Sequence, residues 1–125
     1  LKYIHAHPVA QVSVAGGVAK MTKLAQGRLD LHSRRGSADL PALADLARAA
    51  GAPEELAARI AAAHMVAEAF QIAGAADFAL GDAVARAAWI TAARALGRAD
   101  VRLEIVVFDR DGTLMGRAPF APAVA

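Results

Sequence analysis

The chain has 125 residues, enough for one domain with its own hydrophobic core, and 57% of them are hydrophobic, largely because of alanine. No apolar run approaches the roughly 18 residues of a membrane span, and the absence of cysteine excludes a disulfide framework, so we expect a cytoplasmic protein with no membrane partner. The formal net charge is only +2 and aromatic residues make up 5%, a balance that argues against a nucleic-acid partner.

The first clear pattern is a strand followed by a helix. Val12, Val14 and Ala15 predict a short strand over about 11–15 that ends at Gly16 and Gly17, where the backbone can turn sharply. A helix follows and ends near Gly27. Its apolar positions share one arc at helical spacing: Val18, Met21, Leu24 and Ala25.

Lys20 and Lys23 are three residues apart, which makes them neighbours on the side of this helix away from its apolar arc. Exposed lysines are common, so one interpretation is a solvated face. The other is an anion site, because a glycine turn that leads into a helix presents free backbone N–H groups. A polar cluster follows directly: His32, Ser33, Arg34 and Arg35.

Three further helices are predicted in the middle of the chain. The first, capped by Ser37 or Asp39, ends at Gly51. The second begins at Pro53 and carries one apolar stripe through Leu56, Ile60, Ala63, Ala67 and Phe70, with Met65 and Ile72 on the other side. The third is capped by Asp77 and ends at Gly97.

The chain closes with a strand and a hairpin. Alternating apolar residues predict a strand over 101–108, and Asp109-Arg110-Asp111-Gly112 predicts a turn into a short edge strand over 113–116. We expect 119–125 to be a disordered tail. The fold class is therefore α/β, a small sheet of these strands covered by alanine-rich helices.

The run that contains Asp109 and Asp111 also matches the D-x-D-G-T opening of haloacid dehalogenase-like phosphatases. In that interpretation Asp109 attacks phosphate, Asp111 transfers the proton and Mg²⁺ neutralises the phosphoryl oxygens. None of the twelve residues after Thr113 is acidic or a lysine, although that chemistry needs such groups downstream, so we favour the turn. A non-catalytic interaction module, using Met65 and Ile72 as its surface, is a further alternative.

As a whole, the run from Ala15 to Gly36 resembles the C-terminal signature of the CbiD family of cobalt-precorrin-5B C1-methyltransferases, roughly G-K-x-x-K-L-A-x-G-x-x-x-T-H-S. It departs from that signature at Ala19, where glycine is usual, and at Leu31, where threonine is usual. The matching positions are Lys20, Lys23, Leu24, Ala25, Gly27, His32 and Ser33.

The resemblance implies the C-terminal domain, or a fragment, of an S-adenosylmethionine-dependent C-methyltransferase of cobalamin biosynthesis. Its substrate would be a carboxylate-rich tetrapyrrole that brings its own cobalt, so no metal site is expected in the protein. No adenosylmethionine motif is visible in this chain, so the position of that site, inside the chain or in the missing part, is left open. The other partner of this chain would be the remainder of its longer chain. An oligomer is left open.

The same resemblance, read with the chemistry of the side chains, suggests a role for each candidate residue. Gly16, Gly17, Lys20, Lys23 and the two arginines Arg34 and Arg35 would bind the carboxylates of the substrate. His32 would move a proton, because an unperturbed imidazole with a pKa of about 6.5 exchanges protons near neutral pH. Ser33 would orient His32 or bind a carboxylate. A structural role for His32 in the loop is the alternative.

Overall fold

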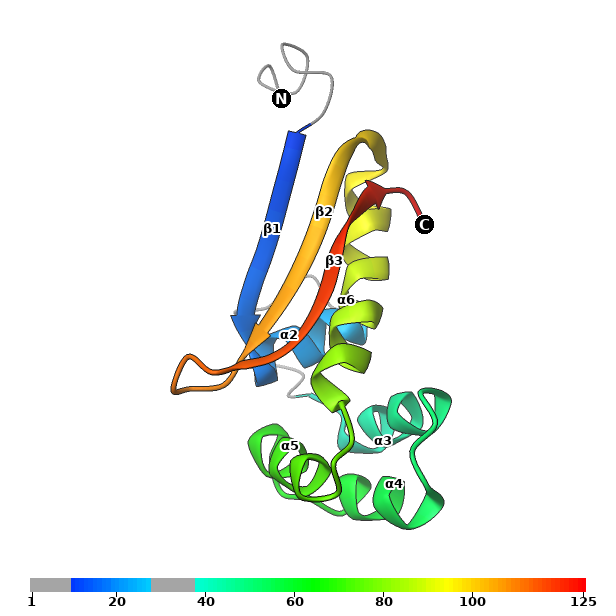
Figure 1. The fold of residues 1–125 in the computed structure, drawn as a ribbon. Coiled ribbons are helices and arrows are strands. Elements are labelled where there is room, and N and C mark those ends of the chain that lie inside the picture. Colours follow the sequence, from blue (N-terminus) through cyan, green and yellow to red (C-terminus); the bar gives the residue numbers. More distant parts are fainter. Residues whose placement is uncertain (1–9, 28–37) are drawn as a thin grey trace.

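The computed structural model describes residues 10–27 and 38–125, and within them it confirms the α/β class (Figure 1). The three expected strands are present, and each is longer than the sequence pattern predicted. In chain order the elements are β1 (Ala10–Gly17), α2 (Val18–Ala25), α3 (Leu40–Ala49), α4 (Glu54–Ala61), α5 (Val66–Ala75), α6 (Leu80–Leu96), β2 (Arg98–Phe108) and β3 (Leu114–Ala123).

The three described strands form one sheet in the order β1-β2-β3. β1 runs parallel to β2, from the pair Ala10 and Val101 to the pair Gly17 and Phe108, whereas β3 is antiparallel to β2. Alternation along β2 is as predicted, because every second side chain is fully buried on one face. These buried residues are Val101, Leu103, Ile105 and Val107.

Helices α6 and α2 cover this buried face of the sheet (Figure 1). The start of α6 lies against β3 backbone to backbone, since a Cβ on Gly81 would overlap the Met115 carbonyl and one on Gly116 would overlap Gly81. Asp82 Oδ1 then accepts a hydrogen bond of 3.0 Å from the Arg117 backbone N–H. Glycine at both positions therefore lets the helix approach the strand closely.

The second middle helix was predicted wrongly as a single element. It is two helices, α4 and α5, separated by a break at 62–65. At the break the backbone of Met65 is extended, and the His64 N–H donates to Glu68 Oε2 at 2.8 Å, which satisfies a free donor at the start of α5. Ile72 packs against the core, while Met65 is exposed, so the two residues do not form one surface.

Helix starts and the chain end also differ in part from expectation. Asp39 caps α3 as predicted, through a 3.0 Å bond from the Ala42 N–H to its Oδ1. Asp77 does not cap α6, which begins at Leu80; its backbone instead turns through a positive φ of 57°. Residues 119–123, expected in a disordered tail, continue β3 because they pair with the long strand β2.

Candidate functional site

The parallel pairing brings two turns to the same edge of the sheet. β1 and β2 end side by side at Gly17 and Phe108, so the glycine turn before α2 lies next to the turn that joins β2 to β3 (Figure 1). The carboxyl edge of parallel strands is the usual position of ligand sites in α/β proteins. A shallow hollow opens there, lined by Ala15, Gly16, Gly17, Phe108, Asp109, Arg110 and Gly112.

Gly16 and Gly17 have different structural roles. A Cβ on Gly16 would lie 2.8 Å from Met21 Sδ, so glycine lets α2 fold back until Met21 is fully buried. A Cβ on Gly17 would meet only the Phe108 carbonyl oxygen, at 3.9 Å. Gly17 is the N-cap of α2 and has no side chain to cap the helix. The first turn also holds no acidic residue. The backbone N–H groups at this helix start are therefore available to an anion.

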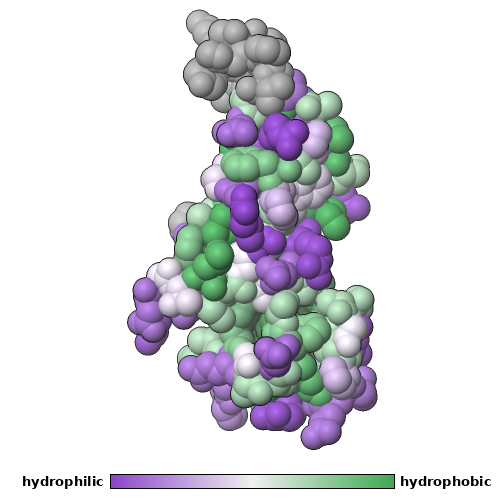
Figure 2. Space-filling view, viewed as in Figure 1, coloured by the Kyte–Doolittle hydropathy of each residue, from purple (hydrophilic) through white to green (hydrophobic). Residues whose placement is uncertain are grey.

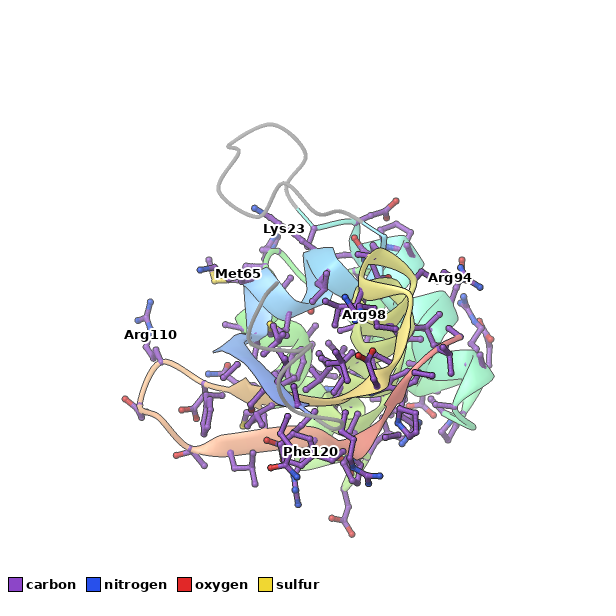
Figure 3. The ribbon with its side chains drawn as sticks, turned by 90° about the horizontal axis from the view of Figure 1, so that it is seen from above. Lys23, Met65, Arg94, Arg98, Arg110 and Phe120 are labelled. Carbon is purple, nitrogen blue, oxygen red and sulfur yellow. The ribbon has the colours of Figure 1, made fainter. Side chains whose placement is uncertain are left out.

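Lys20 and Lys23 add positive charge to this edge. Lys20 is exposed, and its Cδ would lie 3.4 Å from a Cβ on Gly16, so its stem runs beside the glycine turn. Lys23 follows in the last turn of α2 and is half-buried. Figure 3 shows Lys23 and Arg110 pointing outward from α2 and from the β2–β3 turn. The structure thus brings Gly16, Gly17 and Lys20 together, with Lys23 one helical turn further on.

The β2–β3 turn is held by Asp109. Its Oδ1 accepts 2.9 Å hydrogen bonds from the N–H groups of Asp111 and Thr113, and its own N–H donates to the Thr113 carbonyl at 3.0 Å. This is the side-chain-to-backbone bonding of an Asx turn. It agrees with the predicted turn, because one oxygen of the Asp109 carboxylate holds the loop.

The remaining predicted site residues, His32, Ser33, Arg34 and Arg35, lie outside the described residues. Within 10–27 and 38–125 there is no group of three or more His, Cys, Asp or Glu side chains that could hold a metal ion. In the same part of the chain, no helix is both long enough and apolar enough to cross a membrane.

A polar cluster on the sheet face opposite α6 was not predicted from the sequence. Glu104 is only 9% exposed; its Oε1 accepts from the Ser13 hydroxyl at 2.7 Å and its Oε2 from Arg117 Nε at 2.6 Å. The Ser13 hydrogen bond first, and then the Arg117 guanidinium, hold the pKa of the Glu104 carboxyl below its usual value. The three residues lie far apart in sequence, so only the strand register could have revealed the cluster.

Thr22 is a second feature that spacing did not reveal. Its side chain is fully buried in α2, and its Oγ1 has no hydrogen-bond partner among the residues that the structure describes. A buried hydroxyl without a partner costs free energy, whereas most buried polar groups are paired.

Residues 30–119 match the family model described as CbiD, C-terminal domain. The chain is 55% identical, over 98% of its own length and 33% of the relative's, to a cobalt-precorrin-5B C(1)-methyltransferase of Agrobacterium fabrum. It is 54% identical to the Bradyrhizobium sp. protein of that name, over 94% of this chain and 31% of the relative.

A third relative of the same name, from Halorhodospira halophila, is 53% identical over 97% of this chain and 32% of its own. No solved structure matches the chain. The chain therefore spans about a third of the length of these curated relatives.

Proposed function

This chain belongs to the CbiD family, through that family's C-terminal domain, and from this premise we propose that it is the C-terminal part of a methyltransferase acting on C1 of cobalt-precorrin-5B. The observation that carries the proposal is the match to relatives of that name over nearly the whole chain. Because the chain spans about a third of those relatives, the activity is proposed for the longer protein rather than for this part alone. We propose the cytoplasm as its location.

We propose that the carboxyl edge of β1 and β2 binds the substrate through its carboxylates. Gly17 and the free N–H groups of α2 offer hydrogen-bond donors, and Lys20 beside them offers a positive charge. A carboxylate at such a place would gain both charge-assisted hydrogen bonds and the favourable helix dipole. Lys23 would bind a second carboxylate from the next turn. The sequence adds Arg34 and Arg35 to this set.

His32 and Ser33 are proposed from the sequence alone. An imidazole can take up and release a proton near neutral pH, which suits the loss of a two-carbon unit that the family resemblance implies for this reaction. Ser33 would hold the imidazole in one orientation by a hydrogen bond.

The cosubstrate named by the resemblance, S-adenosylmethionine, does not fit the described part of this edge. The hollow offers one carboxylate positioned by hydrogen bonds, that of Asp109, and its Oδ1 already holds the turn. Gly16 and Gly17 are also too few glycines for a dinucleotide-type fingerprint. We therefore propose that the cosubstrate binds in the preceding part of the longer chain.

Titration of this chain with cobalt-precorrin-5B under anaerobic conditions, followed by corrinoid absorbance, tests the proposal. The double variant Lys20→Ala, Lys23→Ala is expected to weaken saturable binding several-fold, because each exposed ion pair is worth about 0–1 kcal/mol. High salt is expected to weaken binding by the unaltered chain. The matched control is Arg59→Ala, Arg94→Ala, which removes the same charge from exposed positions on α4 and α6.

Two results would contradict the proposal. If both double variants lose the same affinity, net charge rather than the glycine edge would explain binding. If neither this chain nor the chain joined to the preceding part of the Agrobacterium fabrum relative binds the corrinoid, the edge is not the substrate site.

A further inference from the structure

We propose that the sheet face opposite α6, here called the open face, is the docking surface for the preceding part of the longer chain. This inference rests on the proposed function only in taking this chain to be part of a longer protein. It adds the surface through which the two parts meet.

The open face is uncovered within the described part of the chain. The helices that contact the strands, α6 and α2, both lie on the face of Val101 and Ile105, and Figure 1 shows no described element over the other face. Alternation along the strands places a second set of apolar side chains there. This set comprises Val106, Phe108, Leu114 and Phe120, and none of the four packs against the core.

These apolar residues are at least partly accessible to a partner: Leu114 is exposed, and Val106, Phe108 and Phe120 are half-buried. Leu114 is 55% exposed, and its Cα partner across the sheet is Phe108. Figure 3 shows Phe120 on the side of β3 away from α6. In Figure 2, which looks onto the open face, hydrophobic and hydrophilic residues lie side by side along the strands. Such a mixture is typical of the interfaces between domains of one chain.

The polar centre of the open face is already satisfied. Both carboxylate oxygens of Glu104 accept hydrogen bonds, from the hydroxyl of Ser13 and from the guanidinium of Arg117. Covering this cluster would bury no unpaired carboxylate oxygen, which is the costly case. A glutamate on a strand that faces water can be hydrated and does not need two protein partners. The two partners of Glu104, from β1 and β3, therefore fit a face that is covered in the longer protein.

Two observations identify the occupant as the preceding part of the chain. First, β1 and β2 are parallel, and parallel strands are normally covered on both faces. Second, about two-thirds of the length of the matched relatives lies outside this chain, and the matched family model is a C-terminal domain, so the missing length precedes it. That length is more than enough to cover three strands.

The docking surface also meets the candidate site. Phe108 belongs to the open face and lines the hollow beside Gly17. A domain seated on the open face would therefore form a wall of the hollow, and ligand sites are often found at domain interfaces. The substrate edge would then be completed by the partner that covers the sheet.

The test measures association between this chain and the preceding part of the Agrobacterium fabrum relative, produced separately, by isothermal titration calorimetry. Thermal melts first establish that each part is folded. Leu114→Glu is expected to weaken association at least tenfold, because it places a charge in the interface. Met65→Glu is the matched control, since Met65 is 61% exposed between α4 and α5, and it is expected to change affinity less than twofold.

If either part does not fold alone, the same two variants are compared in the joined chain. There Leu114→Glu is expected to lower the melting temperature by several degrees more than Met65→Glu. The proposal is overturned if folded parts do not associate, or if the two variants have equal effects in whichever format is used. Self-association of this chain, abolished by Leu114→Glu, would also overturn it, because the occupant would be a second copy.

The docking inference and the proposed function fail separately. Association with the expected variant pattern, but no corrinoid binding even by the joined chain, would leave the docking surface in place and remove the substrate site. Suppose instead that corrinoid binding depends on Lys20 and Lys23, but association of the two parts is unaffected by Leu114→Glu. That result would support the substrate site and refute the docking surface.

Discussion

The close approach of α6 to β3 makes Gly81→Ala the most informative substitution for the fold. A Cβ at this position would overlap the Met115 carbonyl and would lie 2.9 Å from the Gly116 nitrogen, and all of these atoms belong to the backbone. Met115 lies at an irregularity of β3, between the paired residues Leu114 and Gly116, and its backbone carbonyl cannot rotate away as a flexible side chain can. The helix would have to shift, and the bond between Asp82 and the Arg117 N–H would then lengthen or break.

The expected loss can be estimated from two opposing terms. Overpacking costs about 1–3 kcal/mol, and we take the upper value because the overlapped atoms are backbone. Replacing glycine by alanine in a helix returns up to about 1 kcal/mol. The net loss in free energy of unfolding is therefore about 2 kcal/mol, which at about 4 °C per kcal/mol lowers the melting temperature by about 8 °C.

Urea unfolding followed by circular dichroism measures this loss, and Gly74→Ala is the control. Gly74 also lies in a helix, but a Cβ there would meet nothing within 4 Å, so the control should gain stability by up to about 1 kcal/mol. If Gly81→Ala is as stable as the unaltered chain, the reasoning from close backbone packing is refuted.

Three further variants test single interactions by the same unfolding measurement. Thr22→Val removes the unpartnered buried hydroxyl at nearly constant shape and should leave stability unchanged or raise it by about 1 kcal/mol; a loss would mean that the hydroxyl has a partner. Asp39→Ala removes the cap on the Ala42 N–H and should cost about 1 kcal/mol, with Asp39→Asn costing less. Glu104→Gln should destabilise in a pH-dependent way. The folded pKa of Glu104 is lowered, so its ionised form stabilises the fold above the ordinary value of about 4.3, and this contribution is lost as the pH falls through the folded pKa. The gap between the unaltered chain and Glu104→Gln should thus be constant near neutral pH and shrink below about pH 4; a gap that widens in acid would contradict the assignment.

Local signals predicted much of this fold. The Asp39 cap and the turn at Asp109 each depend on residues within a few positions, and both have the hydrogen bonds that the sequence led us to expect. Gly97 ends α6 in the left-handed conformation, as a glycine after a helix commonly does. The alternation of β2 follows from burial on one face alone.

The errors arose where the apolar pattern hides a local contact or where tertiary contacts decide. The apolar stripe continues across the break before α5, so periodicity could not reveal that the Glu68 carboxylate caps a new helix start. The prolines and alanines of 119–123 carry no strand pattern, and their pairing depends on the length of β2. For the candidate site, the sequence proposed the glycine turn and Lys20, which the structure places side by side. It could not place Asp109 and Arg110 beside them, because that requires the parallel register of β1 and β2.

The exposure of Lys20 sets a limit on what this chain can do by itself. An ion pair between an exposed ammonium group and a carboxylate is worth about 0–1 kcal/mol in water, too little for tight binding. If the preceding part of the chain covers the open face and walls the hollow at Phe108, water is excluded and the same contact becomes stronger. Cobalt-precorrin-5B should therefore bind the joined chain at least tenfold more tightly than this chain. Leu114→Glu should remove that advantage without touching the lysines, whereas equal affinities in both formats would show that docking does not complete the site.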